Sequence, residues 1–70
     1  MMPLSIARPG EPVTIKMVKG TDEVRQHLYE LGFINGEQIS VISQVGGNLI
    51  IQVKDSRIAL DRTMANRIYI

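Results

Sequence analysis

The chain has 70 residues, of which 44% are hydrophobic and 21% charged, and its formal net charge is +1 at pH 7. This length excludes two separate cores, so we expect a single domain over residues 1–70. The sequence has no Cys, which excludes disulfide frameworks, thiolate nucleophiles and Cys-based metal sites and is typical of a reducing, cytoplasmic environment. No apolar run approaches the roughly 18 residues of a membrane span, and the nearly balanced charge argues against a dedicated nucleic-acid-binding protein.

The first predicted strand begins near Val13. Val13, Ile15 and Met17 alternate with other residues directly after the turn-forming segment 9–12, Pro-Gly-Glu-Pro. Alternation with a period of two is typical of a strand with one buried face. We therefore expect this strand to contribute one row of side chains to the core.

A helix is predicted over residues 21–31. Thr21 can cap its N-terminus, and Gly32 can end it because Gly adopts positive φ at little cost. The apolar residues that recur at helical spacing in this segment are Val24, Leu28 and Leu31. We expect this apolar stripe to face the core.

The second half of the chain predicts three consecutive strands and a short final one. Residues 38–45 and 49–53 are rich in β-branched residues and are separated by a Gly-Gly-Asn turn, and residues 57–60 follow a polar turn. Residues 61–66 predict a single capped helical turn, and residues 67–70 a last strand.

Five short strands are too few for a β-sandwich of usual size, whereas a small barrel buries one face of each strand and leaves little unpaired edge. The sequence therefore predicts a mainly β protein, a small SH3-like five-stranded barrel. One short α-helix between strands 1 and 2 is expected to cover one open end of the barrel.

The segment 28–42, Leu-Tyr-Glu-Leu-Gly-Phe-Ile-Asn-Gly-Glu-Gln-Ile-Ser-Val-Ile, resembles the FeoA family of ferrous iron transport proteins. The segments 49–53 and 57–60 look like the hairpin and the Arg-(Ile/Val)-Ala-Leu strand of that family. Asn35 stands where many members have Pro, but Asn-Gly also supports a tight turn. The resemblance implies an SH3-like barrel in the cytoplasm that docks on the cytosolic domain of the membrane transporter FeoB. It implies no enzymatic activity.

A second interpretation is a metal-responsive module, because similar barrels form the C-terminal domain of diphtheria-toxin-repressor-type regulators. On the predicted helix, Glu23, His27 and Glu30 follow one another at i, i+4 and i+7. Imidazole and carboxylate ligands suit a divalent transition metal such as Fe(II) or Mn(II). The competing interpretation of these three residues is a solvated helix flank.

The predicted docking region is the end of the helix, with Leu28, Leu31, Gly32 and Phe33 as candidate partner-binding residues. Phe33 and Ile34 are two large apolar residues between a helix-ending Gly and a turn. Such a corner is either part of the core or an exposed anchor for another protein.

The residues Lys54, Arg57, Arg62 and Arg67 give the C-terminal segment a basic character. These charges either form a docking surface for an acidic partner or RNA, or protect β-edges from aggregation. The three aromatic residues are too scattered to stack nucleic-acid bases, so no nucleic-acid partner is expected. Edge strands in so small a barrel can pair between copies, so weak self-association is a further expectation.

Overall fold

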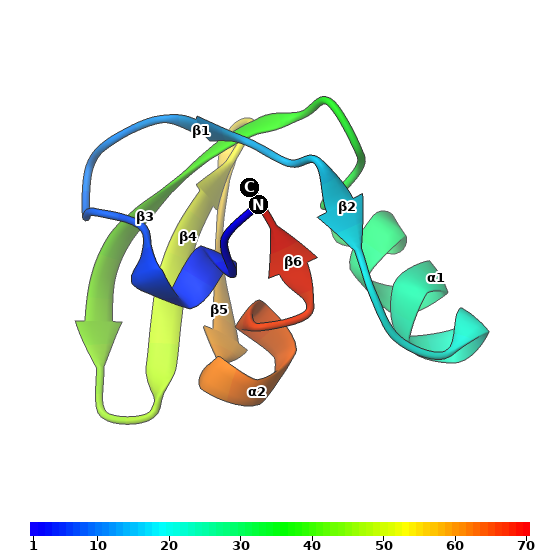
Figure 1. Cartoon of the computed structure of the whole chain (residues 1–70). Helices are drawn as coiled ribbons and strands as arrows, with labels where there is room; N and C mark the ends of the chain where they lie inside the picture. Colours follow the sequence, from blue (N-terminus) through cyan, green and yellow to red (C-terminus); the bar gives the residue numbers. More distant parts are fainter.

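The computed structural model describes residues 1–70 and is mainly β (Figure 1). Its elements are, in chain order, the 3₁₀ turn η1 (Leu4–Ile6), β1 (Val13–Thr14), β2 (Met17–Val18), α1 (Asp22–Glu30), β3 (Gln38–Val45), β4 (Asn48–Val53), β5 (Ser56–Asp61), α2 (Arg62–Ala65) and β6 (Ile68–Tyr69). None of its helices combines the length and the apolar character that crossing a membrane would require.

The strands form two antiparallel sheets. The larger sheet has the order β1-β3-β4-β5, and the smaller one pairs β2 with β6. The chain passes from one sheet to the other at two adjacent residues: the Ile15 N–H donates to the Glu37 carbonyl at 2.9 Å, and the Lys16 N–H donates to the Tyr69 carbonyl at 2.8 Å. Met2 extends the smaller sheet by exchanging two backbone hydrogen bonds with Ile70, of 2.9 and 2.8 Å.

The structure corrects the predicted five-stranded closed barrel. The single strand expected from Val13 onward is two strands, β1 and β2, so there are six strands and α1 lies between β2 and β3. The barrel is not closed, because β5 pairs only with β4 and leads through α2 into β6. The helical turn α2, capped by the Asp61 carboxylate on the Met64 N–H at 2.8 Å, turns the chain away before β5 and β6 can pair.

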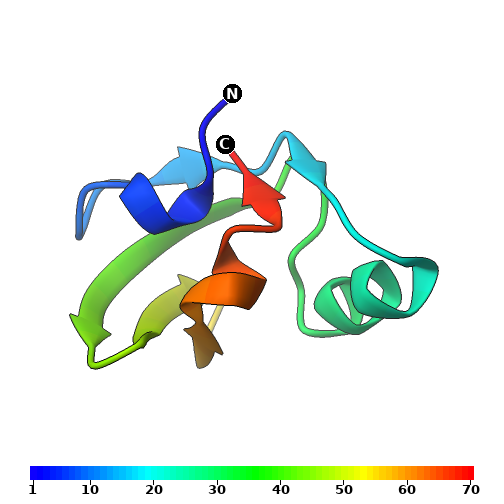
Figure 2. The same cartoon turned by 60° about the horizontal axis from the view of Figure 1, so that its bottom comes forward.

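The core lies between the two sheets and is covered by α1, η1 and α2 (Figures 1 and 2). Strand β4 shows the expected alternation, with Leu49, Ile51 and Val53 buried. The other buried apolar residues are Leu4, Ala7, Ile15, Val18, Leu28, Phe33, Ile39, Val41, Leu60, Ala65, Ile68 and Ile70. Helix α1 begins as predicted, because the Thr21 hydroxyl accepts a hydrogen bond from the Val24 N–H at 3.3 Å.

Candidate functional site: the end of helix α1

Helix α1 ends in a Schellman motif. The Gly32 N–H donates to the Tyr29 carbonyl and the Phe33 N–H to the Leu28 carbonyl, both at 3.0 Å. Gly32 has φ of 103°, which the motif requires of the residue after the last turn and which only Gly adopts easily. A Cβ on Gly32 would lie 2.9 Å from Cγ1 of Val53 in β4, so the missing side chain also allows the helix end to approach the sheet closely.

Two of the four residues predicted to bind a partner are part of the core. Leu28 and Phe33 have no exposed surface, because the Schellman motif places one apolar residue from each side of the Gly against the core. They cannot present a side chain to a partner in this structure. Leu31 and Gly32 are half-buried, so they retain surface that another molecule can contact.

The exposed apolar side chains at this helix end are those of Tyr29 and Ile34, which are 36% and 46% exposed. Together with the half-buried Leu31 and Gly32 they form what we call the helix-exit surface: Tyr29, Leu31, Gly32 and Ile34. The predicted set omitted Tyr29 and Ile34. No signal in the sequence separates them from the buried Leu28 and Phe33, because all four side chains are large and apolar.

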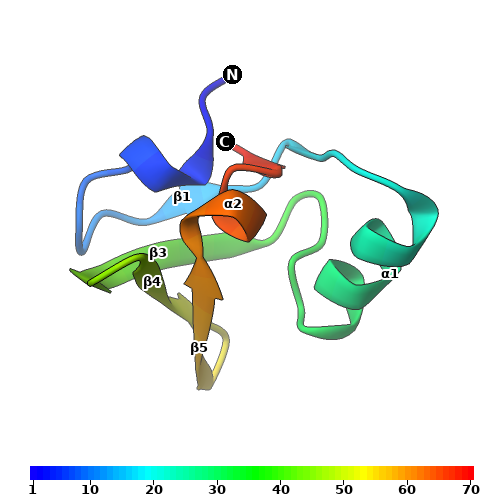
Figure 3. The same ribbon diagram turned by 90° about the horizontal axis from the view of Figure 1, so that it is seen from below.

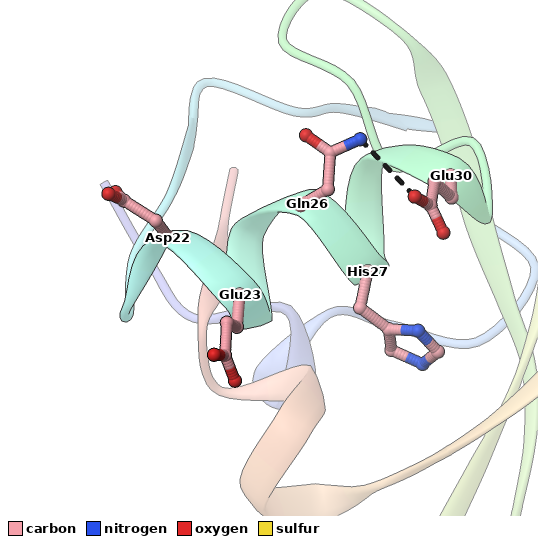
Figure 4. A pocket seen from close by; sticks show the side chains of 5 residues that line it. All are labelled: Asp22, Glu23, Gln26, His27 and Glu30. Atoms are coloured by element: carbon pink, nitrogen blue, oxygen red, sulfur yellow. Dashed lines mark hydrogen bonds between the residues drawn. The ribbon is translucent and has the colours of Figure 1, made fainter.

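The structure does not bring the three candidate metal ligands together around one point. Glu23, His27 and Glu30 line a shallow hollow with Asp22 and Gln26. The Glu30 carboxylate accepts a hydrogen bond from Gln26 Nε2 at 3.3 Å, and the His27 side chain points away from this pair (Figure 4). No three His, Cys, Asp or Glu side chains in the structure lie close enough together to hold a metal ion. The prediction placed the three residues on one stripe correctly, but their side chains diverge.

A second group of exposed apolar side chains surrounds the N-terminus. Met1, Met2 and Ile6 are 67%, 49% and 59% exposed. The residues that line both of the adjoining hollows are Met2, Val13 and Ile70. The turn η1, which contains Ile6, lies on the side of the molecule opposite α1, and the N-terminus lies between the two (Figures 2 and 3).

The basic residues of the C-terminal segment bind different neighbours. Arg57 Nε donates to Gln52 Oε1 at 3.2 Å, and the Arg62 guanidinium donates to Gln44 Oε1 at 2.9 Å. The Arg67 guanidinium lies beside Gly20 at the start of α1. Their contacts are thus spread over three places on the molecule.

The sequence and the fold are similar to those of known proteins. A family model described as FeoA domain matches residues 2–70. A protein of Methanocaldococcus jannaschii, provisionally named Fe(2+) transport protein A, is 34% identical over 70 residues, which is the whole of this chain and 85% of that protein. A crystal structure of an iron uptake regulatory protein, FeoA, has a TM-score of 0.86 at 32% identity, with 96% of this chain and 91% of the other covered.

The zinc complex of FeoA from Stenotrophomonas maltophilia, described as an SH3 domain protein, also has a TM-score of 0.86, at 28% identity and with 99% and 88% of the two chains covered. These likenesses confirm the predicted SH3-like fold and the resemblance that the sequence suggested. The chain belongs to the FeoA domain family.

Proposed function

We propose that this chain is an accessory protein of ferrous iron transport that acts by docking on the cytosolic region of a FeoB-type membrane transporter. The observation that carries the accessory role is the FeoA family match over residues 2–70. The name of the Methanocaldococcus jannaschii relative supports the same role. An accessory protein can change transport by binding the membrane protein that moves the ion, so the proposal requires an exposed surface suited to binding a protein.

The helix-exit surface is the proposed contact. Tyr is among the residues that supply most of the binding energy in protein interfaces. Tyr29 offers such a side chain, and the exposed Ile34 and half-buried Leu31 add apolar surface at the same helix end. Carboxylates and the His27 imidazole lie on the adjoining turns of α1. The arrangement is an apolar centre next to a polar margin, which is the usual composition of such an interface.

Rigid presentation favours this surface over the N-terminal group of exposed residues. Ile34 directly follows the buried Phe33, and its N–H donates to the Gly32 carbonyl at 3.0 Å. Its backbone is therefore already ordered before binding. Met1 and Met2 have three rotatable side-chain bonds each, and ordering such side chains on binding costs free energy.

Two matched substitutions test the proposal. The Kd for the purified cytosolic region of the FeoB-type transporter is measured by isothermal titration calorimetry for the unmodified chain, for Ile34→Asp and for Ile6→Asp. Both isoleucines are exposed, at 46% and 59%, and they lie on opposite sides of the molecule. We expect Ile34→Asp to raise Kd by about tenfold or more, because a buried unpaired carboxylate costs at least about 1.4 kcal/mol. We expect Ile6→Asp to leave Kd unchanged.

Circular dichroism melting curves check that both variants remain folded. Binding that is absent for the unmodified chain at millimolar concentration would contradict docking itself. Binding that Ile6→Asp weakens and Ile34→Asp does not would contradict the helix-exit surface as the contact.

A further inference from the structure

Strand β5 is the last strand of the larger sheet, and its outer edge has no partner. It pairs with β4 over its whole length and with no other strand. Figure 3 shows β5 at the border of the sheet, with no strand beside its outer edge. Such an edge presents a row of unpaired N–H and C=O groups, which is a template for another strand.

The backbone groups of Arg57 and Ala59 point to this open edge. Directly after β5, the Arg62 N–H donates to the Gly47 carbonyl on the β4 side, at 3.0 Å. Backbone groups alternate in direction along a strand, so the even-numbered residues of β5 face β4 and the odd-numbered ones face outward. Among the backbone hydrogen bonds outside the helices and strands, none involves Arg57 or Ala59, and both residues are exposed.

Two copies of β5 can pair antiparallel only in registers that place odd-numbered residues opposite odd-numbered ones, because only these point their backbone groups outward. With Arg57 opposite its own copy, two like charges meet. With Arg57 opposite Ala59 of the second copy, neither Arg57 nor Asp61 meets an opposite charge, because Asp55 lies in the turn before β5. Registers centred nearer the start of β5 run into the turn at residues 54–55, and those centred nearer its end run into α2.

Only one register pairs opposite charges within β5, with Ala59 opposite Ala59 of the second copy. It places Arg57 opposite Asp61 of the second copy, and the two-fold axis repeats this pair on the other side. Opposite charges in this position stabilise strand pairing, and like charges destabilise it. The same register sets the half-buried Ile58 against Leu60 of the second copy on the inner face. The charges of β5 thus select this alignment.

We propose that the β5 edge is a homotypic contact, through which two copies of this chain join their four-stranded sheets about a two-fold axis at Ala59. Both charged residues of the contact are already ordered in the single chain. Arg57 is held by Gln52, and Asp61 caps α2 through one carboxylate oxygen. The contact concerns the protein alone and does not depend on docking to a transporter.

Cysteine cross-linking tests this register. The chain has no Cys, so Ala59→Cys introduces one thiol per copy. In the proposed pair the two Cα atoms at this position lie about 5.5 Å apart, which a disulfide spans. Ser56→Cys is the control, because Ser56 is also an exposed β5 residue but its two copies would lie about 20 Å apart along the strand. Oxidation with copper phenanthroline and non-reducing electrophoresis give the rate of dimer formation.

We expect Ala59→Cys to cross-link much faster than Ser56→Cys. Adding Arg57→Glu to Ala59→Cys should reduce the rate to that of Ser56→Cys, because it places a carboxylate opposite Asp61 of the second copy. Adding Asp55→Asn should leave the rate unchanged, because Asp55 faces no charge in this register. Equal rates for the two Cys variants, or a rate that Arg57→Glu does not alter, would overturn the proposal. The cross-linking assay contains no transporter, so its outcome neither supports nor contradicts docking on a transporter.

Discussion

The close approach of the helix end to the sheet makes Gly32→Ala a sensitive test of the structure. The new methyl group would meet Val53 Cγ1 at 2.9 Å, a distance that real Cβ atoms do not keep. Val53 is a buried β4 residue with 3% exposure, so it cannot move into solvent. The substitution also forces a side chain onto a residue with φ of 103°.

The close contact with Val53 and the positive φ at Gly32 both make Gly32→Ala destabilising, and their free-energy costs add. A non-Gly residue in a sparsely populated backbone region costs about 1–3 kcal/mol, and overpacking a core costs about 1–3 kcal/mol. The small gain from a stiffer unfolded chain offsets part of this. We expect Gly32→Ala to lower the free energy of unfolding by about 2–4 kcal/mol. A chain of 70 residues has only about 3.5–10 kcal/mol in total, so the loss is a large share of its stability.

Gly36→Ala is the matched control. Gly36 also has positive φ, 89°, but a Cβ there would meet nothing within 4 Å. Gly36→Ala therefore introduces the backbone strain of a positive φ but no steric overlap with another residue. Urea unfolding followed by circular dichroism gives both free energies, and the difference between the two variants isolates the contact with Val53. Equal losses for Gly32→Ala and Gly36→Ala would refute the close approach of the helix end to β4.

Three further substitutions test other parts of the structure. Phe33→Ala should cost about 3–5 kcal/mol in the same urea assay, because Phe33 has no exposed surface; a variant of unchanged stability would show that Phe33 is not a core residue. Thr21→Ala should lower stability by about 1 kcal/mol and Thr21→Ser much less, because only the hydroxyl caps α1. Lys19→Met should cost about 0.5–1 kcal/mol, because the Lys19 ammonium lies 4.7 Å from the centre of the Tyr69 ring; the loss should be absent in a Tyr69→Leu background.

Most secondary structure follows from periodicity in the sequence. The strand predicted over residues 38–45 coincides with β3, and the helix predicted over residues 21–31 contains α1 with its capping residues. Both segments carry strong patterns, a period of two in one and a helical repeat with caps in the other. In these two segments the local sequence pattern sufficed to predict the element, because the tertiary contacts of the folded chain favour the same structure.

The division between β1 and β2 could not be read from the sequence. Alternation through Val13, Ile15 and Met17 looks the same for one strand as for two strands in different sheets. The chain changes sheets because Ile15 and Lys16 donate to carbonyls of Glu37 and Tyr69, which are distant in sequence. Only the tertiary structure brings these partners together.

At the candidate site, the sequence predicted the helix end but not which of its side chains are exposed. The Gly after the apolar stripe predicted where α1 ends, and the structure confirms it. The sequence could not decide which apolar residues there face inward, because the buried Leu28 and Phe33 and the exposed Ile34 are all large and apolar. Similarly, helical spacing placed Glu23, His27 and Glu30 on one stripe, but side-chain rotamers decide whether such ligands converge.

The most direct test of transporter docking is an NMR titration. The ¹⁵N-labelled chain is titrated with the unlabelled cytosolic region of a FeoB-type transporter, and the amide shifts are mapped onto the structure. We expect the largest shifts at Tyr29, Leu31, Gly32 and Ile34, with the N-terminal residues Met2 and Ile6 unaffected. A spectrum that stays unchanged at saturating transporter concentration, or shifts confined to the N-terminal residues, would contradict the account.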